Sequence, residues 1–154
     1  MTTITSAFLD AFNRRDVNGI LDCFTTDVTY DDLFYGGFAG HDGLRRLFER
    51  MFREARHEWI ADRVLVSPGA EMVEWTFHYV VSEAVPRSAG KALSIRGVSV
   101  FEVGDGRCRA YREYFDIGRA LAEVGVGPAP LHRMLTRPQS FAPRRPAERE
   151  RSDR

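Results

Sequence analysis

The stretch Asp105-Gly-Arg-Cys-Arg-Ala-Tyr-Arg-Glu-Tyr-Phe-Asp116 decides the fold. Its Asp-Gly pair predicts a tight hairpin turn, because glycine readily takes the positive φ that such turns need. The alternation that follows predicts a strand, with one face formed by Arg109, Tyr111, Glu113 and Phe115. If this face is the inner one, Glu113 lies between two aromatic rings. Burial there would raise its pKa toward the range that acid–base chemistry requires.

Helical spacing of apolar residues dominates the first third of the chain. It predicts helices over 4–12, over 17–24 after an N-cap at Asp16, and over 44–55 after an N-cap at Asp42. Residues 28–33 form a predicted strand that places Tyr30 and Asp32 on the same side. The residues between this strand and the third helix are rich in glycine and aromatics, which indicates a loop.

The period then changes from helical spacing to two. Strands are predicted over 57–67, 71–83 and 93–103, and the opening stretch completes a four-strand antiparallel meander. A short helix follows, with its N-cap at Asp116 and its end at Gly125. Helices followed by strands indicate an α+β fold, a curved antiparallel sheet packed on three N-terminal helices. Such a cone has a central pocket lined by inner strand residues.

Composition predicts one cytoplasmic domain. The chain has 154 residues, 44% of them hydrophobic, and its formal net charge is zero, which gives no case for nucleic acid or membrane partners. Its two cysteines fit a reduced compartment, and there is neither a leader pattern nor a membrane-length apolar run. We expect a domain over 1–128. The Pro- and Arg-rich tail over 129–154 is expected to be disordered or loosely attached from about Arg137.

Several motifs resemble those of the SnoaL-like polyketide cyclases of the nuclear transport factor 2-like superfamily. They are Phe8-Leu-Asp-Ala-Phe-Asn13, Gly40-His-Asp-Gly-Leu44, Arg96-Gly-Val-Ser-Val-Phe101, Asp105-Gly-Arg107 and Tyr111-Arg-Glu-Tyr-Phe-Asp116. The resemblance covers roughly residues 4–127 and implies the cone-shaped fold. It also implies a hydrophobic small-molecule substrate and a homodimer formed through an exposed sheet face. This fold hosts isomerases, dehydratases, cyclases, epoxide hydrolases and non-catalytic binders.

The last strand also resembles that of the limonene epoxide hydrolases, in which an aspartate stands where this chain has Glu113. An arginine and an aspartate of that family match Trp75 and Phe77 here, so the resemblance implies that the water-activating triad is absent. The tyrosine and asparagine of its first strand resemble Tyr30 and Asp32. A carboxylate and a polar patch are therefore kept, whereas the means of activating water is lost.

Four residues are candidates for catalysis: Glu113, Tyr30, Asp32 and His78. A histidine could act as an acid or a base near neutral pH. However, strict alternation places His78 on the face opposite Trp75 and Phe77. Three alternatives follow. The pocket is lined by Thr76 and His78 with the aromatic residues on an interface, or a bulge shifts the register, or His78 has a structural role. For His41 and His57, at element boundaries, capping or surface roles are predicted, and His132 lies in the tail.

The remaining candidates line the pocket or orient the substrate. They are Trp59, Trp75, Phe77, Arg96, Tyr111 and Phe34. Aromatic residues at strand spacing also suit a core or an interface, and Arg96 also suits an ion pair. No metal and no nucleotide cofactor is predicted, because His57-Glu58 lacks a second histidine at helical spacing and the glycines form no phosphate-binding loop.

Together these observations favour a cofactor-independent acid–base cyclase of bacterial secondary metabolism. It would close a ring on a hydrophobic polyketide- or terpenoid-like intermediate, by an aldol-type step or by attack of a hydroxyl on an epoxide. In the epoxide reaction, Tyr30 or protonated His78 would donate a proton, and Glu113 or Asp32 would accept one. A dehydratase, isomerase or epoxide hydrolase acting in the same pocket, and a non-catalytic ligand-binding dimer, remain alternatives.

Overall fold

The computed structural model describes residues 2–136 and confirms the α+β prediction. The helices are α1 (Ile4–Asn13), α2 (Val17–Asp22), α3 (Gly40–Glu54), α4 (Ile117–Glu123) and α5 (Pro128–Thr136). The strands are β1 (Phe24–Asp32), β2 (Gly36–Ala39), β3 (Ala55–Ser67), β4 (Ala70–Val81), β5 (Ala92–Gly104) and β6 (Arg107–Phe115). None of the helices within residues 2–136 is long and apolar enough to cross a membrane.

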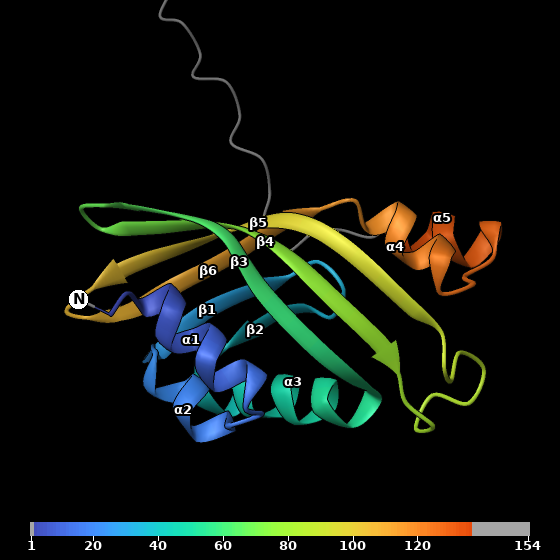
Figure 1. Cartoon of the computed structure of the whole chain (residues 1–154), viewed down its shortest axis with the longest axis horizontal. Helices are drawn as coiled ribbons and strands as arrows, with labels where there is room; N and C mark the ends of the chain where they lie inside the picture. Colours follow the sequence, from blue (N-terminus) through green and yellow to red (C-terminus); the bar gives the residue numbers. More distant parts are fainter. Residues whose placement is uncertain (1, 137–154) are drawn as a thin grey trace, which may run out of the picture.

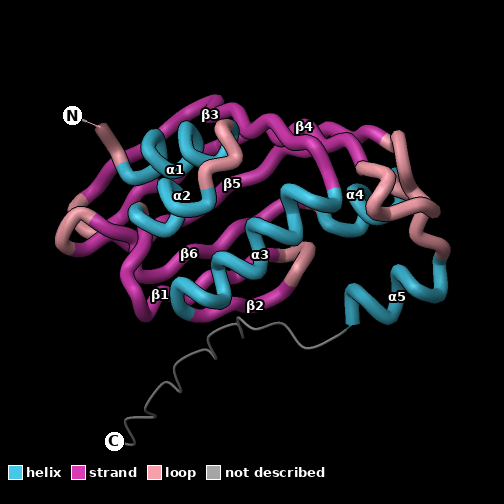
Figure 2. Tube along the Cα trace, turned by 90° about the horizontal axis from the view of Figure 1, so that it is seen from below, coloured by secondary structure: helices cyan, strands magenta, loops and turns pink. Residues whose placement is uncertain are grey.

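All six strands form one sheet, in the order β2-β1-β6-β5-β4-β3. The predicted antiparallel meander from β3 to β6 is confirmed. The sequence predicted a first strand but not its position in the sheet. This strand, β1, pairs in parallel with β6, so the sheet is mixed. The sheet curves strongly over α1, α2 and α3, whereas α4 and α5 lie at one end (Figure 1). Figure 2 shows the same three N-terminal helices lying across one face.

Both ends of α1 are attached to the sheet by polar side chains. At its start, the buried carboxylate of Glu71 accepts the backbone N–H groups of Ile4 at 3.1 Å and Thr5 at 2.8 Å. These N–H groups have no partner within a helix, and a carboxylate also complements the positive end of the helix dipole. At its end, the Asn13 amide donates to the Trp59 carbonyl at 2.8 Å and accepts from the Trp59 N–H at 2.9 Å. The edge strand β3 is thereby tied to α1.

Aromatic rings fill the space between helices and sheet. Phe8 of α1 is fully buried, with ring centroids of Phe24, Trp59 and Phe101 at 5.3–5.6 Å in edge-to-face geometry. Buried aromatics contribute large apolar areas and favour tilted pairs of this kind. This cluster forms a packed core between the helices and the sheet.

Several predicted boundaries need correction. Phe24 begins β1 instead of ending the second helix, because its backbone enters the sheet beside β6. The predicted loop before α3 contains β2, which pairs with β1. Asp42 lies inside the first turn of α3, whose N-cap is Ala39. The tail prediction missed α5, and the segment predicted to be disordered, from about Arg137, lies outside the described residues.

A bulge in the β5–β6 pair changes which residues of the stretch 105–116 share a face of the sheet. Glu102 lies opposite Ala110, but the next pair is Val103 with Cys108, so Arg109 is the extra residue. Such an insertion reverses the alternation beyond it. Cys108 is consequently buried and Arg109 is exposed, with its guanidinium 3.7 Å from the Glu102 carboxylate. The prediction that Arg109 shares the face of Glu113 is therefore wrong, whereas Tyr111 and Glu113 do share it.

Candidate active site

A cavity of about 480 Å³, counted as all space not filled by atoms, lies on the concave side of the sheet. Its wall is apolar and aromatic apart from two carboxyl groups and two tyrosine hydroxyls, and it comprises Asp32, Phe34, Tyr35, Met51, Trp59, Trp75, Phe77, Tyr79, Leu93, Ile95, Glu113 and Phe115. The predicted substrate-binding residues Phe34, Trp59, Trp75 and Phe77 are thus on this wall, and their contact with a substrate remains a prediction.

The two carboxyl groups meet because β1 and β6 run in parallel. Asp31 lies beside Arg112 in the register, which makes Asp32 and Glu113 neighbours at the strand ends. The Asp32 Oδ1 atom accepts the N–H groups of Phe34 and Tyr35, both at 2.7 Å. This turn holds the Asp32 carboxyl at the base of the cavity. The predicted pair of Tyr30 and Asp32 on one face is confirmed by their burial on the inner side.

Each oxygen of Glu113 has a donor. The N–H of Leu33 donates to Oε1 at 3.1 Å, and the hydroxyl of Tyr111 donates to Oε2 at 2.8 Å. Burial and the nearby charge of Asp32 nevertheless raise the pKa of Glu113 well above its ordinary range. Burial also raises the pKa of Asp32, to about 6, against the opposing effect of its two N–H donors. Environment therefore separates the pKa values of two acids in one cavity.

Tyr30 and Tyr111 lie behind this wall and do not line the cavity. Their rings stack with centroids 4.0 Å apart and planes 12° apart. Burial is the main cause that raises the pKa of both phenols well above their ordinary range. The structure thus corrects two predicted positions: Tyr111 contacts Glu113 instead of a substrate, and Tyr30 is a ring in the core.

The structure places His78 and Arg96 on the outer face of the sheet. Register is regular here, with Thr76 opposite Arg96 and His78 opposite Ser94, so no bulge turns either side chain inward. His78 Nδ1 bonds to the Ser94 hydroxyl at 2.6 Å, and Arg96 is exposed. Neither residue lines this cavity, because strict alternation holds along β4 and β5, and their predicted roles at the substrate stay predictions.

His57 is the titratable group that sequence reasoning misplaced. It lies among Phe12, Phe52, Phe77 and Tyr79, and neither buried ring nitrogen has a hydrogen-bond partner. Burial, aided by the positive charge of Arg15, lowers its pKa to about 4. The surface or capping role predicted for His57 is wrong. Its alternation with Trp59 on β3 was the available signal, because Trp59 faces inward.

A second cavity, of about 920 Å³, adjoins the first and shares Phe34, Tyr35 and Tyr79 with it. At this junction the Tyr35 hydroxyl donates to Glu54 at 3.1 Å, and the Arg50 Nε donates to the same carboxylate at 2.8 Å. The Arg50 guanidinium also lies 4.9 Å from the centre of the Tyr35 ring. Sequence reasoning missed this polar group. The aromatic, glycine-rich segment containing Tyr35 was its only signal.

Within residues 2–136, no group of three or more His, Cys, Asp or Glu side chains could hold a metal ion. Asp32 and Glu113 form a pair without a third ligand. Both cysteines are buried and free, and burial raises their thiol pKa to about 11 for Cys23 and about 12 for Cys108. Neither therefore has the lowered pKa of a nucleophilic cysteine.

Residues 5–111 match the model of the SnoaL-like domain family. The chain belongs to this family. A proposed polyketide cyclase from Pseudomonas putida KT2440 resembles this SnoaL-like domain with a TM-score of 0.73 at 20% identity, covering 81% of this chain and 100% of that one. A proposed polyketide cyclase from Xanthomonas campestris gives 0.72 at 23% identity, covering 79% and 94%.

An epoxide hydrolase of the LEH-like type from M. tuberculosis is also similar to this SnoaL-like domain. Its TM-score is 0.66 at 22% identity, covering 79% of this chain and 86% of that one. At such identities the likeness shows the shared fold alone. No curated protein sequence matches the chain significantly. The expected membership of the SnoaL-like group is thus confirmed, and the chemistry has to be argued from the cavity.

Proposed function

We propose that this SnoaL-like domain is a cofactor-independent acid–base cyclase of bacterial secondary metabolism. It closes a ring on a hydrophobic polyketide- or terpenoid-like intermediate. One observation carries the proposal: two carboxyl groups with separated pKa values, Asp32 and Glu113, stand in a cavity whose wall is otherwise almost wholly apolar and aromatic. An apolar cavity with a few converging polar groups is the usual form of a small-molecule site.

The separated pKa values assign a role to each carboxyl group. Asp32, with a pKa of about 6, is ionised at neutral pH and serves as the general base. Glu113, the more strongly raised of the two, keeps its proton and serves as the general acid. Because Tyr30 is behind the wall and His78 is on the outer face, neither has a part in this mechanism.

Epoxide opening illustrates the balance of bonds and protons. The substrate's own hydroxyl oxygen attacks one epoxide carbon, so a new C–O bond forms and the epoxide C–O bond breaks. Asp32 takes the hydroxyl proton, and Glu113 gives its proton to the opening oxygen. An aldol closure balances in the same way: Asp32 removes a proton beside a carbonyl, a C–C bond forms, and Glu113 protonates the new alkoxide. Either product is an isomer of its substrate.

The aromatic wall favours an internal nucleophile over water. Trp75 and Phe77 line the cavity at positions where the resemblance to the limonene epoxide hydrolases implies charged side chains, and Trp59 and Phe115 extend the same apolar surface. Two proposed polyketide cyclases share this fold. The adjoining second cavity offers room for a substrate larger than the first cavity alone would hold.

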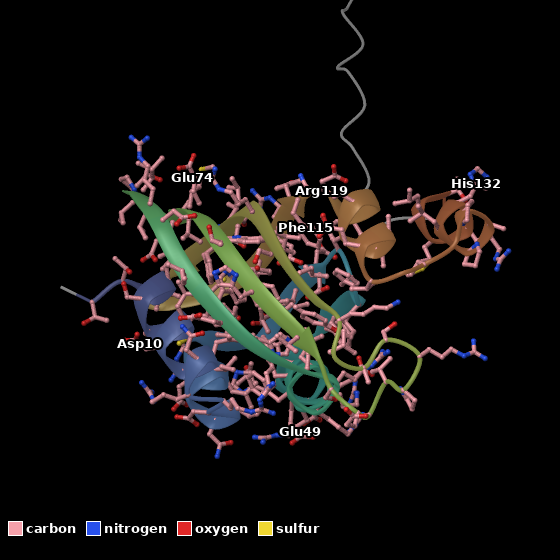
Figure 3. The ribbon with its side chains drawn as sticks, turned by 45° about the vertical axis from the view of Figure 1, so that its right-hand side comes forward. Asp10, Glu49, Glu74, Phe115, Arg119 and His132 are labelled. Atoms are coloured by element: carbon pink, nitrogen blue, oxygen red, sulfur yellow. The ribbon has the colours of Figure 1, made fainter. Side chains whose placement is uncertain are left out.

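The test is to incubate the protein with hydroxy-epoxides and poly-ketone esters and to measure the molecular masses of the products by mass spectrometry. Cyclisation leaves the mass unchanged, dehydration loses one water, and hydrolysis gains one water whose oxygen comes from labelled solvent. We expect isomeric products that disappear with Glu113→Gln and persist with Glu74→Gln, since Glu74 is an exposed residue of β4 on the outer side of the sheet (Figure 3). A water-derived oxygen in the product would replace the cyclase with a hydrolase. Binding of these compounds without any mass change or isomer would favour a non-catalytic binder.

We further propose a cytoplasmic homodimer formed through the outer face of the sheet. Ile60, Leu65, Met72 and Tyr114 are large apolar residues that are 41–51% exposed on this face. Contiguous exposed apolar residues commonly mark interaction surfaces. The two free, buried cysteines fit a reducing compartment. Sedimentation of the wild type against Ile60→Glu tests the dimer, and a monomeric wild type would contradict it.

A further inference from the structure

A row of buried hydrogen bonds links Glu113 to Trp75 behind the cavity wall that both residues line. Trp75 Nε1 bonds to Ser99 Oγ at 2.8 Å, Ser99 Oγ to the Tyr111 hydroxyl at 2.7 Å, and Tyr111 to Glu113 Oε2 at 2.8 Å. Three strands contribute to this row, β4 through Trp75, β5 through Ser99 and β6 through the remaining two residues. Neither Ser99 nor Tyr111 lines the cavity.

The indole at one end and the bond from Tyr111 to Glu113 at the other set the direction of the row. An indole N–H can only donate, so Ser99 Oγ must accept from Trp75. Tyr111 has one hydroxyl hydrogen, so if it donates to Glu113 Oε2, the hydrogen between Ser99 and Tyr111 must come from Ser99. Tyr111 in turn directs its hydrogen to Glu113 Oε2. We propose that Trp75, Ser99 and Tyr111 form a one-way relay that positions Glu113, committing Oε2 to accept a hydrogen bond and leaving the acid proton on Oε1.

The position of Oε1 gives this assignment a consequence for the reaction. In a protonated carboxyl group the carbonyl oxygen is the better acceptor, and Oε2 is the oxygen that accepts the hydroxyl hydrogen of Tyr111. Oε1 has the longer contact, 3.1 Å from the N–H of Leu33, the residue directly after Asp32. The proton is therefore held on the side of Glu113 that faces the Asp32 turn. There the proton can be transferred to the substrate, and Asp32, the proposed base, can then return a proton to Glu113.

Burial and one glycine hold the relay in place. Ser99, Tyr111 and Trp75 are 0%, 1% and 2% exposed, so water cannot replace the protein donors. Gly97 lies directly opposite Trp75 in the β4–β5 register. A Cβ at Gly97 would stand 2.5 Å from the Trp75 ring and 2.7 Å from the Tyr114 carbonyl. The missing side chain is what lets the indole lie across β5 and reach Ser99.

The relay makes a prediction about ionisation that packing alone does not. A hydrogen bond from Tyr111 favours the ionised carboxylate and lowers the Glu113 pKa, against the effects of burial and Asp32. The other titratable groups around Glu113 are Tyr30 of β1 and, across the cavity, Tyr35 and Tyr79. Weakening the relay at any member should therefore raise the Glu113 pKa further, most strongly at Tyr111 and less with each step toward Trp75.

The experiment follows isotope-labelled glutamate carboxyl carbons by NMR during a pH titration, with Glu113→Gln assigning the signal. Loss of a hydrogen bond to a charged group changes the ionisation constant of that group roughly tenfold. We therefore expect the pKa of Glu113 to rise by about 1 in Tyr111→Phe. Ser99→Ala and Trp75→Phe should raise the pKa by successively smaller amounts. Ser99→Thr, which keeps a hydroxyl, should return it toward the wild-type value if the fold is retained in a thermal melt.

Trp59→Phe is the matched control. The Trp59 indole also lines the cavity and is buried, but its N–H has no hydrogen-bond partner. This variant should leave the Glu113 pKa unchanged. Equal shifts in Trp59→Phe and Trp75→Phe, or no shift in Tyr111→Phe, would overturn the relay. The relay rests on the proposed function only in treating Glu113 as an acid. Because the titration uses no substrate, its failure is separate from a failure to find cyclase activity.

Discussion

Glu113 and His57 are both titratable side chains surrounded by aromatic rings on the concave side of one sheet, yet their surroundings differ. Both carboxyl oxygens of Glu113 accept a hydrogen bond, and the group lines the cavity. Both ring nitrogens of His57 are buried without a partner, and the ring lies behind Phe77 and Tyr79, which line the cavity. Burial disfavours the charged form in each case, raising one pKa and lowering the other.

The comparison teaches that a shifted pKa does not by itself identify a catalytic group. Glu113 combines the shift with hydrogen-bond donors, a second acid and access to a cavity, which are the conditions for proton transfer to a ligand. His57 has the shift alone, as expected of a neutral ring that helps to pack an aromatic wall. Perturbed ionisation becomes evidence of function only together with geometry.

The two regions also affect stability with opposite sign. The pKa of His57 is about 4 in the fold against an ordinary 6.5, so the unfolded chain binds more protons between these values and stability is lost as pH falls. Asp32 has a raised pKa of about 6, so the folded chain holds its proton longer and stability is lost as pH rises through that value. Glu113 acts in the same direction as Asp32.

The largest expected effect comes from Glu113→Gln. Removing a positioned general acid should lower turnover of the cyclised substrate by roughly 10²–10⁴-fold while substrate binding persists. The neutral amide should also remove the stability loss that Glu113 ionisation causes at high pH, because no buried charge can form. Steady-state kinetics with ligand titration, and unfolding curves at high pH, measure both effects. The Glu74→Gln control should resemble the wild type, and retained turnover in Glu113→Gln would remove this residue from the mechanism.

His57→Phe should abolish the stability loss on the acidic side. The shift from 6.5 to about 4 corresponds to about 3 kcal/mol of unfolding free energy lost on acidification. Denaturant unfolding near neutral pH and near pH 4 measures this difference. The exposed His132, labelled on α5 in Figure 3, provides the control His132→Ala, which should keep the wild-type difference. An unchanged pH dependence in His57→Phe would show that another group causes the loss.

Asp32→Asn tests the coupling between the two acids. The amide keeps an oxygen for the N–H groups of Phe34 and Tyr35 but removes the negative charge, so the pKa of Glu113 should fall. Turnover should fall as well, since the base is lost. The NMR titration of labelled glutamate carboxyls measures the first effect without substrate. A Glu113 pKa that stays the same would mean that burial alone raises it.

His78→Ala should give the smallest effect. This histidine lies on the outer face, where it bonds to Ser94, and we expect turnover to stay at the wild-type level and stability to change by less than about 1 kcal/mol. Kinetics and a thermal melt are sufficient to check it. A large loss of turnover would mean that the outer face contributes to the reaction and would weaken the contrast between the two faces.

The sequence by itself determined much of the local structure. Gly106 takes the positive φ, 74°, that the turn signal predicted, and Asp105 takes 49° beside it. Asp16 and Asp116 cap the helices that follow them. Alternation placed Glu113 among aromatic rings, and the family motifs predicted the cone. These features depend on neighbours in the chain, so the pattern of residue types is enough to predict them.

Only the tertiary structure decided which side chains meet. Asp32 reaches Glu113 because β1 pairs in parallel with β6, a contact between strands far apart in the chain. The relay from Trp75 to Glu113 needs three strands in one register and a glycine opposite the indole. Arg109 turns outward through a bulge, and His57 turns inward on β3. Strand register and pairing arise from the packing of the whole core, which no local pattern contains.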